Sequence, residues 1–97
     1  MKFVQVIEYK TTRIDQVKKL NDEFLAKTEG KRPEGHAYAC KDRDNADTYI
    51  EIVEFPSYEE AMRNNDLPET QEFAEKMMAL CDGPATFRNL DVMEEME

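Results

Sequence analysis

The sequence predicts an α+β domain whose elements follow in the order β-α-β-β-α-β. Four short segments alternate between apolar and polar residues, and apolar residues at helical spacing fill the first and third intervals between them. Glycine, proline or polar clusters mark the junctions. We expect residues 1–97 to form one domain, because the chain is near the lower size limit for a single core and contains no linker.

The first strand is expected over residues 2–9, KFVQVIEY. Strand alternation places Gln5 on the side that carries Phe3, Ile7 and Tyr9, and the valines on the opposite side. Because both sides carry apolar residues, both are expected to be at least partly covered.

A helix is expected to begin at Thr12 and to run to Thr28. The T-R-I-D stretch has the form of a capping box, with Asp15 three residues after Thr12. Gly30 and Pro33 are expected to end this helix.

Two further strands are expected at 36–41 and 48–55, joined by the polar turn DRDNAD. If the hairpin loop has an even number of residues, one side of the pair holds His36, Tyr38, Cys40, Tyr49, Glu51, Val53 and Phe55. The other side then holds Ala37, Ala39, Ile50 and Ile52. The second set suits packing against helices, and the aromatic and polar first set suits an interface or a cavity.

The second helical part is expected to be broken in two. Ser57 and Glu60 form a capping box for a short helix that fades at Asn64 and Asn65, and Pro68 fits the first turn of the next helix. The buried stripe of that next helix is expected to consist of Phe73, Ala74, Met77, Met78, Leu80 and Cys81. A last strand at 85–93 and an acidic tail at 94–97 follow.

This order of elements indicates the split βαβ, or ferredoxin-like, fold: a four-stranded antiparallel sheet with helices on one face. So small a domain gains from a partner that covers the other sheet face, which favours a homodimer through that face.

The net charge of −9 argues against binding to nucleic acid, because phosphate contacts depend on clusters of lysine and arginine. No apolar run has membrane-spanning length, and no secretory segment opens the chain. We expect a cytoplasmic protein in which Cys40 and Cys81 are reduced. One histidine and two separated cysteines also predict no metal site.

His36, Tyr38 and Glu51 are the candidate catalytic residues. His36 is the one side chain whose unperturbed pKa lies near neutrality, and Glu51 is a carboxylate in the middle of an apolar strand. The alternatives are an exposed histidine without a role at the strand entrance, and a solvated or interface-paired glutamate. Tyr9, Tyr38 and Tyr49 could equally be aromatic residues of a dimer interface.

Gln5, Tyr49, Asn64 and Asn65 are the candidate ligand-binding residues. The two asparagines would lie at the mouth of a cavity opened by the helix break. Alternatively, helix capping explains both of them together with Asp66, since such side chains bond to nearby backbone.

Three features of the middle of the chain point to a known family. An expected strand ends in Phe55, a serine-capped helix with an E-E-A segment follows at 57–61, and a proline-acid step starts the next helix at 68–69. Together with KFVQVIEYK at the start and ATFRNLDV near the end, these stretches resemble the dimeric α/β-barrel superfamily. The similarity is greatest to the small stand-alone domains of the antibiotic biosynthesis monooxygenase type.

The resemblance implies a homodimer whose two sheets face each other, with a small apolar cavity between sheet and helices in each subunit. It also implies oxidation of a small hydrophobic or aromatic substrate by molecular oxygen, without metal or flavin. The alternative functions are a non-catalytic dimeric module that binds a small hydrophobic ligand and a structural domain with a filled core.

Overall fold

The structure is a computed structural model that describes residues 1–96; Glu97, the last residue of the expected acidic tail, lies outside them. Its elements are β1 (Phe3–Lys10), α1 (Ile14–Lys27), β2 (Ala37–Lys41), β3 (Thr48–Phe55), α2 (Tyr58–Asn65), α3 (Pro68–Leu80) and β4 (Thr86–Asp91). The predicted order is confirmed, including the break in the second helical part.

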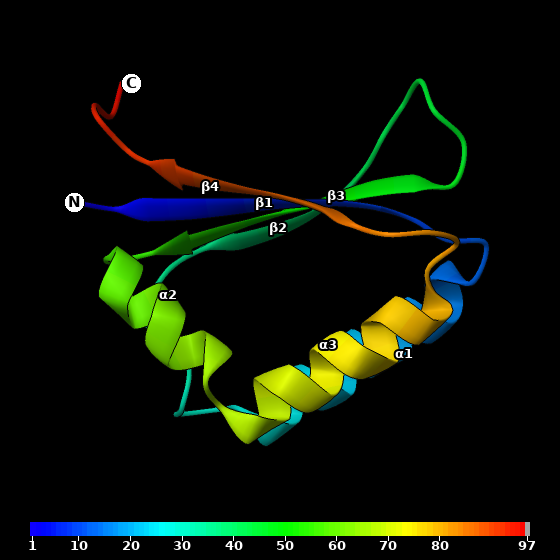
Figure 1. Cartoon of the computed structure of the whole chain (residues 1–97), viewed down its shortest axis with the longest axis horizontal. Helices are drawn as coiled ribbons and strands as arrows, with labels where there is room; N and C mark the ends of the chain where they lie inside the picture. The colour runs from blue at the N-terminus through cyan, green and yellow to red at the C-terminus, as the bar shows by residue number, and fades with distance from the viewer. Residues whose placement is uncertain (97) are drawn as a thin grey trace.

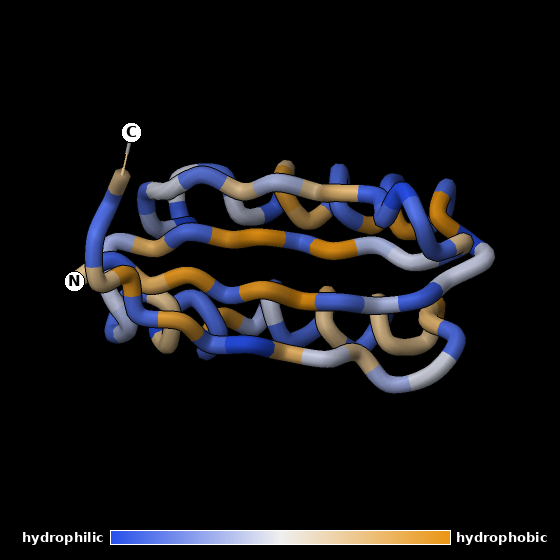
Figure 2. The backbone as a smooth tube through the Cα atoms, turned by 90° about the horizontal axis from the view of Figure 1, so that it is seen from above, coloured by the Kyte–Doolittle hydropathy of each residue, from blue (hydrophilic) through white to orange (hydrophobic). Residues whose placement is uncertain are grey.

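The four strands form one antiparallel sheet in the order β2-β3-β1-β4. All three helices lie on one side of it, which we call the helix-facing side, and the opposite side is called the outer side (Figure 1). Seen from above, the hydrophobic segments concentrate on the two inner strands, β1 and β3 (Figure 2). This is the predicted ferredoxin-like arrangement.

The register of the β2–β3 hairpin differs from the sequence prediction. Lys41 pairs with Tyr49 and Ala39 with Glu51, so an odd number of residues lies between the paired ends. The loop closes with a hydrogen bond from the Asp42 N–H to the Thr48 carbonyl oxygen (2.9 Å) and with Asp47 in the left-handed region at φ 56°.

This register overturns the expected division of side chains between the two faces. The helix-facing side holds Ala37 and Ala39 together with Tyr49, Glu51, Val53 and Phe55. The outer side holds Tyr38 and Cys40 together with Ile50 and Ile52. A shift of one residue in the β2–β3 pairing turns every side chain of one strand to the opposite face of the sheet. The predicted face is therefore wrong for all of β2 relative to β3.

The best-packed part of the interior lies where β1 and β3 pass α2. Phe3, Phe55 and Ala61 are buried together, and the ring of Phe3 meets that of Tyr58 edge-on at 5.4 Å between centroids. The Ser57 hydroxyl oxygen accepts a hydrogen bond from the Glu60 N–H (3.2 Å), as the predicted capping box requires.

The chain enters this end of the sheet through Gly35, two residues before β2 begins at Ala37. Gly35 has φ 149°, and a Cβ atom added to it would overlap the carbonyl oxygen of Glu54. Only glycine allows the backbone to approach β3 so closely.

The start of α1 also differs from the prediction, because Thr12 does not cap it. The N-cap is Arg13, whose side chain makes no capping bond. The Thr11 hydroxyl oxygen accepts from the Arg13 N–H (3.0 Å), and a carboxylate oxygen of Asp82 accepts from the Thr12 N–H (2.8 Å). Thr11 and Asp82, which lie outside the expected box, therefore bond the backbone N–H groups that lead into this helix.

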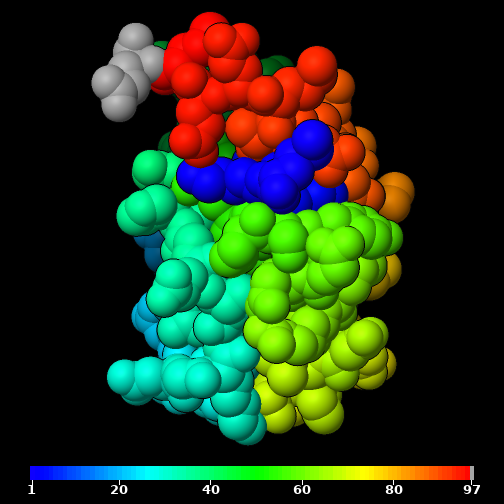
Figure 3. All heavy atoms as spheres, turned by 90° about the vertical axis from the view of Figure 1, so that its left-hand side faces the viewer, coloured from blue at the N-terminus to red at the C-terminus, as the bar shows by residue number. Residues whose placement is uncertain are grey.

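The joint between α2 and α3 combines the end of one helix with a proline start. Asp66 is the C-cap of α2, and Pro68 occupies the first turn of α3 as predicted. The N-cap of α3 is Leu67, which has no capping group, so the asparagines and Asp66 do not supply that cap. Space-filling spheres show α2 and the segment before β2 packed side by side at this end (Figure 3).

The buried stripe expected on α3 is not found: none of its residues is buried. Met78 is 65% exposed, and Ala74 is exposed as well. On α1, Val17 is the one buried residue. The helix pair α1–α3 is thus packed less tightly against the rest of the molecule than α2 is.

Candidate functional site

The side chains in the middle of the helix-facing side of the sheet are only partly covered by the helices. Gln5 and Ile7 of β1 and Tyr49, Glu51 and Val53 of β3 all point toward the helices, yet each is only half-buried. A filled core would exclude solvent from these positions. Solvent therefore reaches these five side chains, and we call Gln5, Ile7, Tyr49, Glu51 and Val53 the interlayer site.

Glu51 is the carboxylate of this site. Within residues 1–96 its side chain makes no ion pair and no hydrogen bond, and burial alone raises its pKa. Because burial disfavours the charged form, Glu51 binds a proton more readily than an exposed glutamate does. A carboxylate with a raised pKa is a stronger base than an exposed one, which makes Glu51 a candidate general base.

Two tyrosines form the aromatic wall beside Glu51. The rings of Tyr9 and Tyr49 stack with centroids 5.7 Å apart, and the pair lies one row along the sheet from Ile7 and Glu51. The pKa of Tyr9 is raised well above its usual value, first by burial and then by the charge of Glu51. Tyr9 therefore stays protonated at physiological pH and presents a hydroxyl group rather than a phenolate.

Cys81 is the C-cap of α3, and it lies close enough to Glu51 for the charge of that carboxylate to affect the Cys81 thiol. Burial, then Asp82, raises the pKa of its thiol; Arg13 lowers it, and Glu51 adds a smaller upward contribution. A thiol with a raised pKa is a poor nucleophile at neutral pH. Cys81 is thus a neutral wall of the site.

An amide pair lies on the other side of Glu51. Gln5 pairs with Asn89 of β4, and the Gln5 Nε2 group donates a hydrogen bond to Asn89 Oδ1 (3.1 Å). Asn89 was absent from the residues predicted for ligand binding. Strand alternation in TFRNLD groups Asn89 with Phe87 and Asp91, but only the pairing of β4 with β1 brings it to Gln5.

The predicted catalytic residues are not brought together. Tyr38 lies on the outer side of β2 and is 58% exposed, and Glu51 lies on the helix-facing side of β3. His36 is exposed just before β2, where its carbonyl oxygen accepts a hydrogen bond from the Glu54 N–H (2.8 Å). Of the three, Glu51 alone lies in the interlayer site.

The predicted ligand-binding residues divide similarly. Gln5 and Tyr49 lie in the interlayer site, on either side of the row that contains Glu51. Asn64 and Asn65 are half-buried in the last turn of α2, before the joint with α3. No bond between their side chains and the sheet connects them to Glu51 in the described part of the chain.

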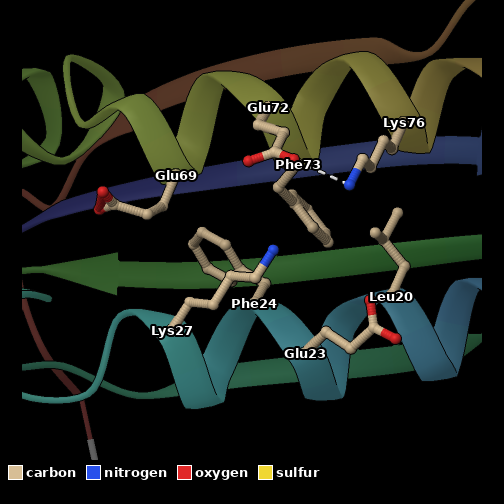
Figure 4. A pocket seen from close by; sticks show the side chains of 8 residues that line it. All are labelled: Leu20, Glu23, Phe24, Lys27, Glu69, Glu72, Phe73 and Lys76. Carbon is tan, nitrogen blue, oxygen red and sulfur yellow. Dashed lines mark ion pairs between the residues drawn. The ribbon is translucent and has the colours of Figure 1, made fainter.

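Two hollows in the described residues are not lined by Glu51 or Gln5. One is in the seam between α1 and α3, where the rings of Phe24 and Phe73 meet at 4.6 Å and Glu72 pairs with Lys76 at 2.8 Å (Figure 4). Its volume of about 10 Å³ is room for one water molecule. The other, about 260 Å³, lies beside Tyr9, Lys10 and the turn Asp82–Pro84. Tyr9 is common to this hollow and to the aromatic wall.

The described residues contain no group of three or more histidine, cysteine, aspartate or glutamate side chains placed to hold a metal ion. Over the same range, no helix has both the length and the apolar character needed to cross a membrane.

No protein-family model matches this sequence, and no curated protein is significantly similar to it in sequence. Solved structures, by contrast, match over nearly the whole chain. A candidate antibiotic biosynthesis monooxygenase from Caulobacter crescentus superposes with a TM-score of 0.83 at 14% identity, covering 96% of this chain and 91% of its own.

Two further structures are similar to the same degree. SnoaB, a cofactor-independent oxygenase from Streptomyces nogalater, gives a TM-score of 0.80 at 12% identity, with 98% of this chain and 96% of SnoaB covered. Rv0793 from Mycobacterium tuberculosis gives 0.77 at 11% identity, with both chains covered completely. At these identities the similarity establishes the fold, and the expected resemblance in fold to antibiotic biosynthesis monooxygenase-like proteins is confirmed.

Proposed function

We propose that the protein is an oxygenase-like enzyme that oxidises a small aromatic substrate with molecular oxygen and without a metal or flavin. The observation that carries this proposal is Glu51: a half-buried, unpaired carboxylate with a raised pKa in a site walled by aromatic rings. Similarity in fold to a cofactor-independent oxygenase supports the same class of reaction.

In the proposed reaction, Glu51 removes a proton from an activated CH₂ group of the substrate, and its carboxylate becomes a carboxylic acid. The resulting carbanion reduces dioxygen and forms a C–O bond, which gives a hydroperoxide once a proton is returned. Loss of water from the hydroperoxide then leaves a ketone. In total, one CH₂ group and one O₂ give one C=O group and one water.

A substrate bound against the tyrosines and the half-buried aliphatic side chains would displace the solvent that reaches these positions in the free protein. Exclusion of water matters because water would reprotonate the carbanion before it meets dioxygen. The neutral Tyr9 and Cys81 place no further negative charge next to the developing carbanion.

The test is oxygen uptake with an anthrone, comparing wild type, Glu51→Gln and Glu54→Gln. Glu54 lies on the same strand as Glu51 but on its outer side, so Glu54→Gln is the matched control. We expect Glu51→Gln to lower turnover by about a hundredfold, the lower range for loss of a general base, and Glu54→Gln to change it little. Unchanged turnover in Glu51→Gln would clear Glu51 of a catalytic role.

Ligand binding without turnover is the second candidate function. It is favoured by the separation of His36 and Tyr38 from Glu51, because no second titratable side chain among residues 1–96 bonds to the carboxylate and orients it. Saturable binding of an anthrone to wild type, with no oxygen uptake above the uncatalysed rate, would support this module over the enzyme.

We propose a homodimer formed through the outer side of the sheet. That side carries a continuous set of apolar residues from all four strands, which are Val4, Val6, Tyr38, Ile50, Ile52 and Leu90. Tyr38 and Leu90 are 58% and 41% exposed in the single chain. A second copy would cover this patch with an identical one, as a two-fold axis requires.

Sedimentation velocity checks the dimer. We expect wild type to sediment as a dimer and Ile52→Lys to weaken the association by at least about tenfold, because a charge would be buried at the centre of the interface. A monomeric wild type at micromolar concentration would overturn the proposal. The proposed location is the cytoplasm, where Cys40 and Cys81, which are not joined in a disulfide, would stay reduced.

A further inference from the structure

The larger of the two hollows, about 260 Å³, lies where the chain passes from α3 into β4 (Figure 1). β4 pairs with β1 only as far as Glu8, so Tyr9 and Lys10 extend past the start of β4. The next residue in register with Lys10 is Pro84, which has no N–H group to donate. The Lys10 carbonyl oxygen instead accepts a hydrogen bond from the Asp82 N–H (2.7 Å). The hollow lies where the loop and β1 separate in this way.

The loop that forms one wall of the hollow is fixed by two bonds of Asp82. Besides the bond from its N–H, a carboxylate oxygen of Asp82 accepts a hydrogen bond from the Thr12 N–H (2.8 Å). Gly83 follows at φ 115°, a backbone conformation that favours glycine, and no atom lies within 4 Å of the place of a Cβ atom there. The wall is therefore ordered before a ligand arrives, which lowers the entropic cost of binding.

Three charged side chains line the hollow, which are Glu8, Lys10 and Asp82. Within residues 1–96, neither Glu8 nor Lys10 forms an ion pair, and the Asp82 carboxylate bonds only to the Thr12 N–H. The Lys10 N–H points to the same side of the strand as its carbonyl oxygen, and no backbone group of the loop accepts a hydrogen bond from it. The hollow therefore offers two carboxylates, one ammonium group and one backbone N–H with unused bonding capacity.

This set of charges limits the class of ligand. Glu8 and Asp82 repel a simple anion. A metal ion would meet two carboxylates beside the ammonium group of Lys10, and the described residues contain no group of three metal-binding side chains. A molecule with adjacent positive and negative groups can bond to all three side chains. The volume of the hollow lies just below the range of roughly 300–1,000 Å³ that is typical of pockets for drug-sized ligands, so it suits one smaller molecule.

We infer that this hollow binds a free α-amino acid. The ammonium group of the ligand lies between the carboxylates of Glu8 and Asp82, and its carboxylate bonds to the Lys10 ammonium group. The side chain of the ligand lies against Pro84, which also lines the hollow. The site shares no residue with the interlayer site or with the apolar patch proposed for the dimer, so the inference goes beyond the proposed function.

An NMR titration of the wild-type protein with leucine tests the inference. Leucine, added to about 10 mM, is expected to shift the backbone amide signals of Lys10, Asp82 and Gly83 in a saturable way. N-acetylleucine lacks the ammonium group, and leucinol lacks the carboxylate. Each analogue is expected to bind at least about tenfold more weakly than leucine, because each loses a charge-assisted hydrogen bond.

Two variants test the assigned contacts. Lys10→Gln and Glu8→Gln are each expected to weaken leucine binding by about tenfold. Lys10→Gln should also reduce the preference for leucine over leucinol, and Glu8→Gln the preference over N-acetylleucine. The controls Lys41→Gln and Glu54→Gln make the same changes in net charge outside the hollow and should leave the affinity unchanged. Glu8 and Lys10 are exposed, so their variants should fold, as thermal unfolding will verify.

The inference is overturned if leucine causes no saturable shifts in wild type, or if either analogue binds as tightly as leucine. Equal weakening of leucine binding by the hollow variants and by their controls overturns it as well, because a general effect of net charge then explains the binding. None of these results affects the proposed role of Glu51, which does not line the hollow. Failure of wild type to oxidise an anthrone, in turn, overturns the proposed function and leaves this site in place.

Discussion

The helix-facing side of the sheet has two regions that are built from the same strands and packed very differently. Under α2, Phe3 and Phe55 are 3% and 6% exposed and close on Ala61. Under α1–α3, four residues further along β1 and β3, Ile7 and Glu51 are half-buried, and no helix residue of α3 is buried. The change in packing occurs over four residues of each strand, so one sheet has a sealed region and an accessible region.

The two regions make different contributions: the sealed region stabilises the fold, and the accessible region contains the proposed site. The sealed region provides apolar burial, an aromatic contact and a capped helix, which are the interactions that stabilise a small domain. The accessible region contains an unpaired carboxylate whose burial opposes folding whenever it is charged. The proposed site lowers the stability of the fold, and the neighbouring sealed region offsets this cost.

The largest expected effect comes from truncation in the sealed region. Phe3→Ala should lower the free energy of unfolding by about 3–5 kcal/mol, since it leaves a cavity under α2. Ile7→Ala, on the same strand and the same side, should cost clearly less because its side chain is already in contact with solvent. Urea denaturation followed by far-UV circular dichroism measures both.

If Phe3→Ala does not fold, Phe55→Leu provides the same comparison with a smaller loss of volume. Equal losses for the Phe3 and Ile7 variants would show that the interlayer site is sealed in solution, and the contrast between the two regions would then be wrong.

A smaller effect of opposite sign is expected from Glu51→Gln. Because the pKa of Glu51 is raised in the folded state, its stabilising contribution is fully present below its ordinary value of 4.5 and is lost as the pH rises through the folded-state pKa. Glutamine stays neutral at every pH. The variant should therefore be more stable than wild type at pH 8, and the difference should shrink as the pH falls toward 4.

Thermal unfolding of both proteins between pH 4 and pH 8 measures this difference, with Glu54→Gln as the control for a glutamate on the outer side. A difference between Glu51→Gln and wild type that does not change with pH would mean that Glu51 is solvated and would remove the physical basis for its proposed role.

Local signals in the sequence predicted most of the fold. Alternation and helical spacing located the seven elements, Ser57 identified a real cap, and Pro68 marked the restart of the helix. These features depend on interactions within a few residues of the chain, which is why the sequence reveals them. The misplaced start of α1 shows the limit, since Asp82 satisfies the Thr12 N–H from a distant loop.

The site was predicted only in part for the same reason. Of the residues predicted for the site, Glu51, Gln5 and Tyr49 lie together on the helix-facing side. The faces of the hairpin were exchanged because the turn contains the left-handed Asp47, whose conformation no residue pattern specified. The hydrogen bond between Gln5 and Asn89 was missed because it depends on pairing between the first and last strands, which are far apart in the sequence. Long-range register is decided by the whole sheet and not by either strand alone.

Gly35 has a consequence for how this sequence can vary. The residues of β2 are all exposed in the single chain, and those other than Tyr38, which belongs to the proposed dimer patch, can be exchanged for many other residues without loss of packing. At position 35, both the backbone angle and the overlap with the Glu54 carbonyl oxygen oppose every other amino acid. Among homologues of this protein, glycine should therefore be invariant at position 35, whereas most residues of β2 should vary. A single glycine would then mark the place where β2 joins the sheet.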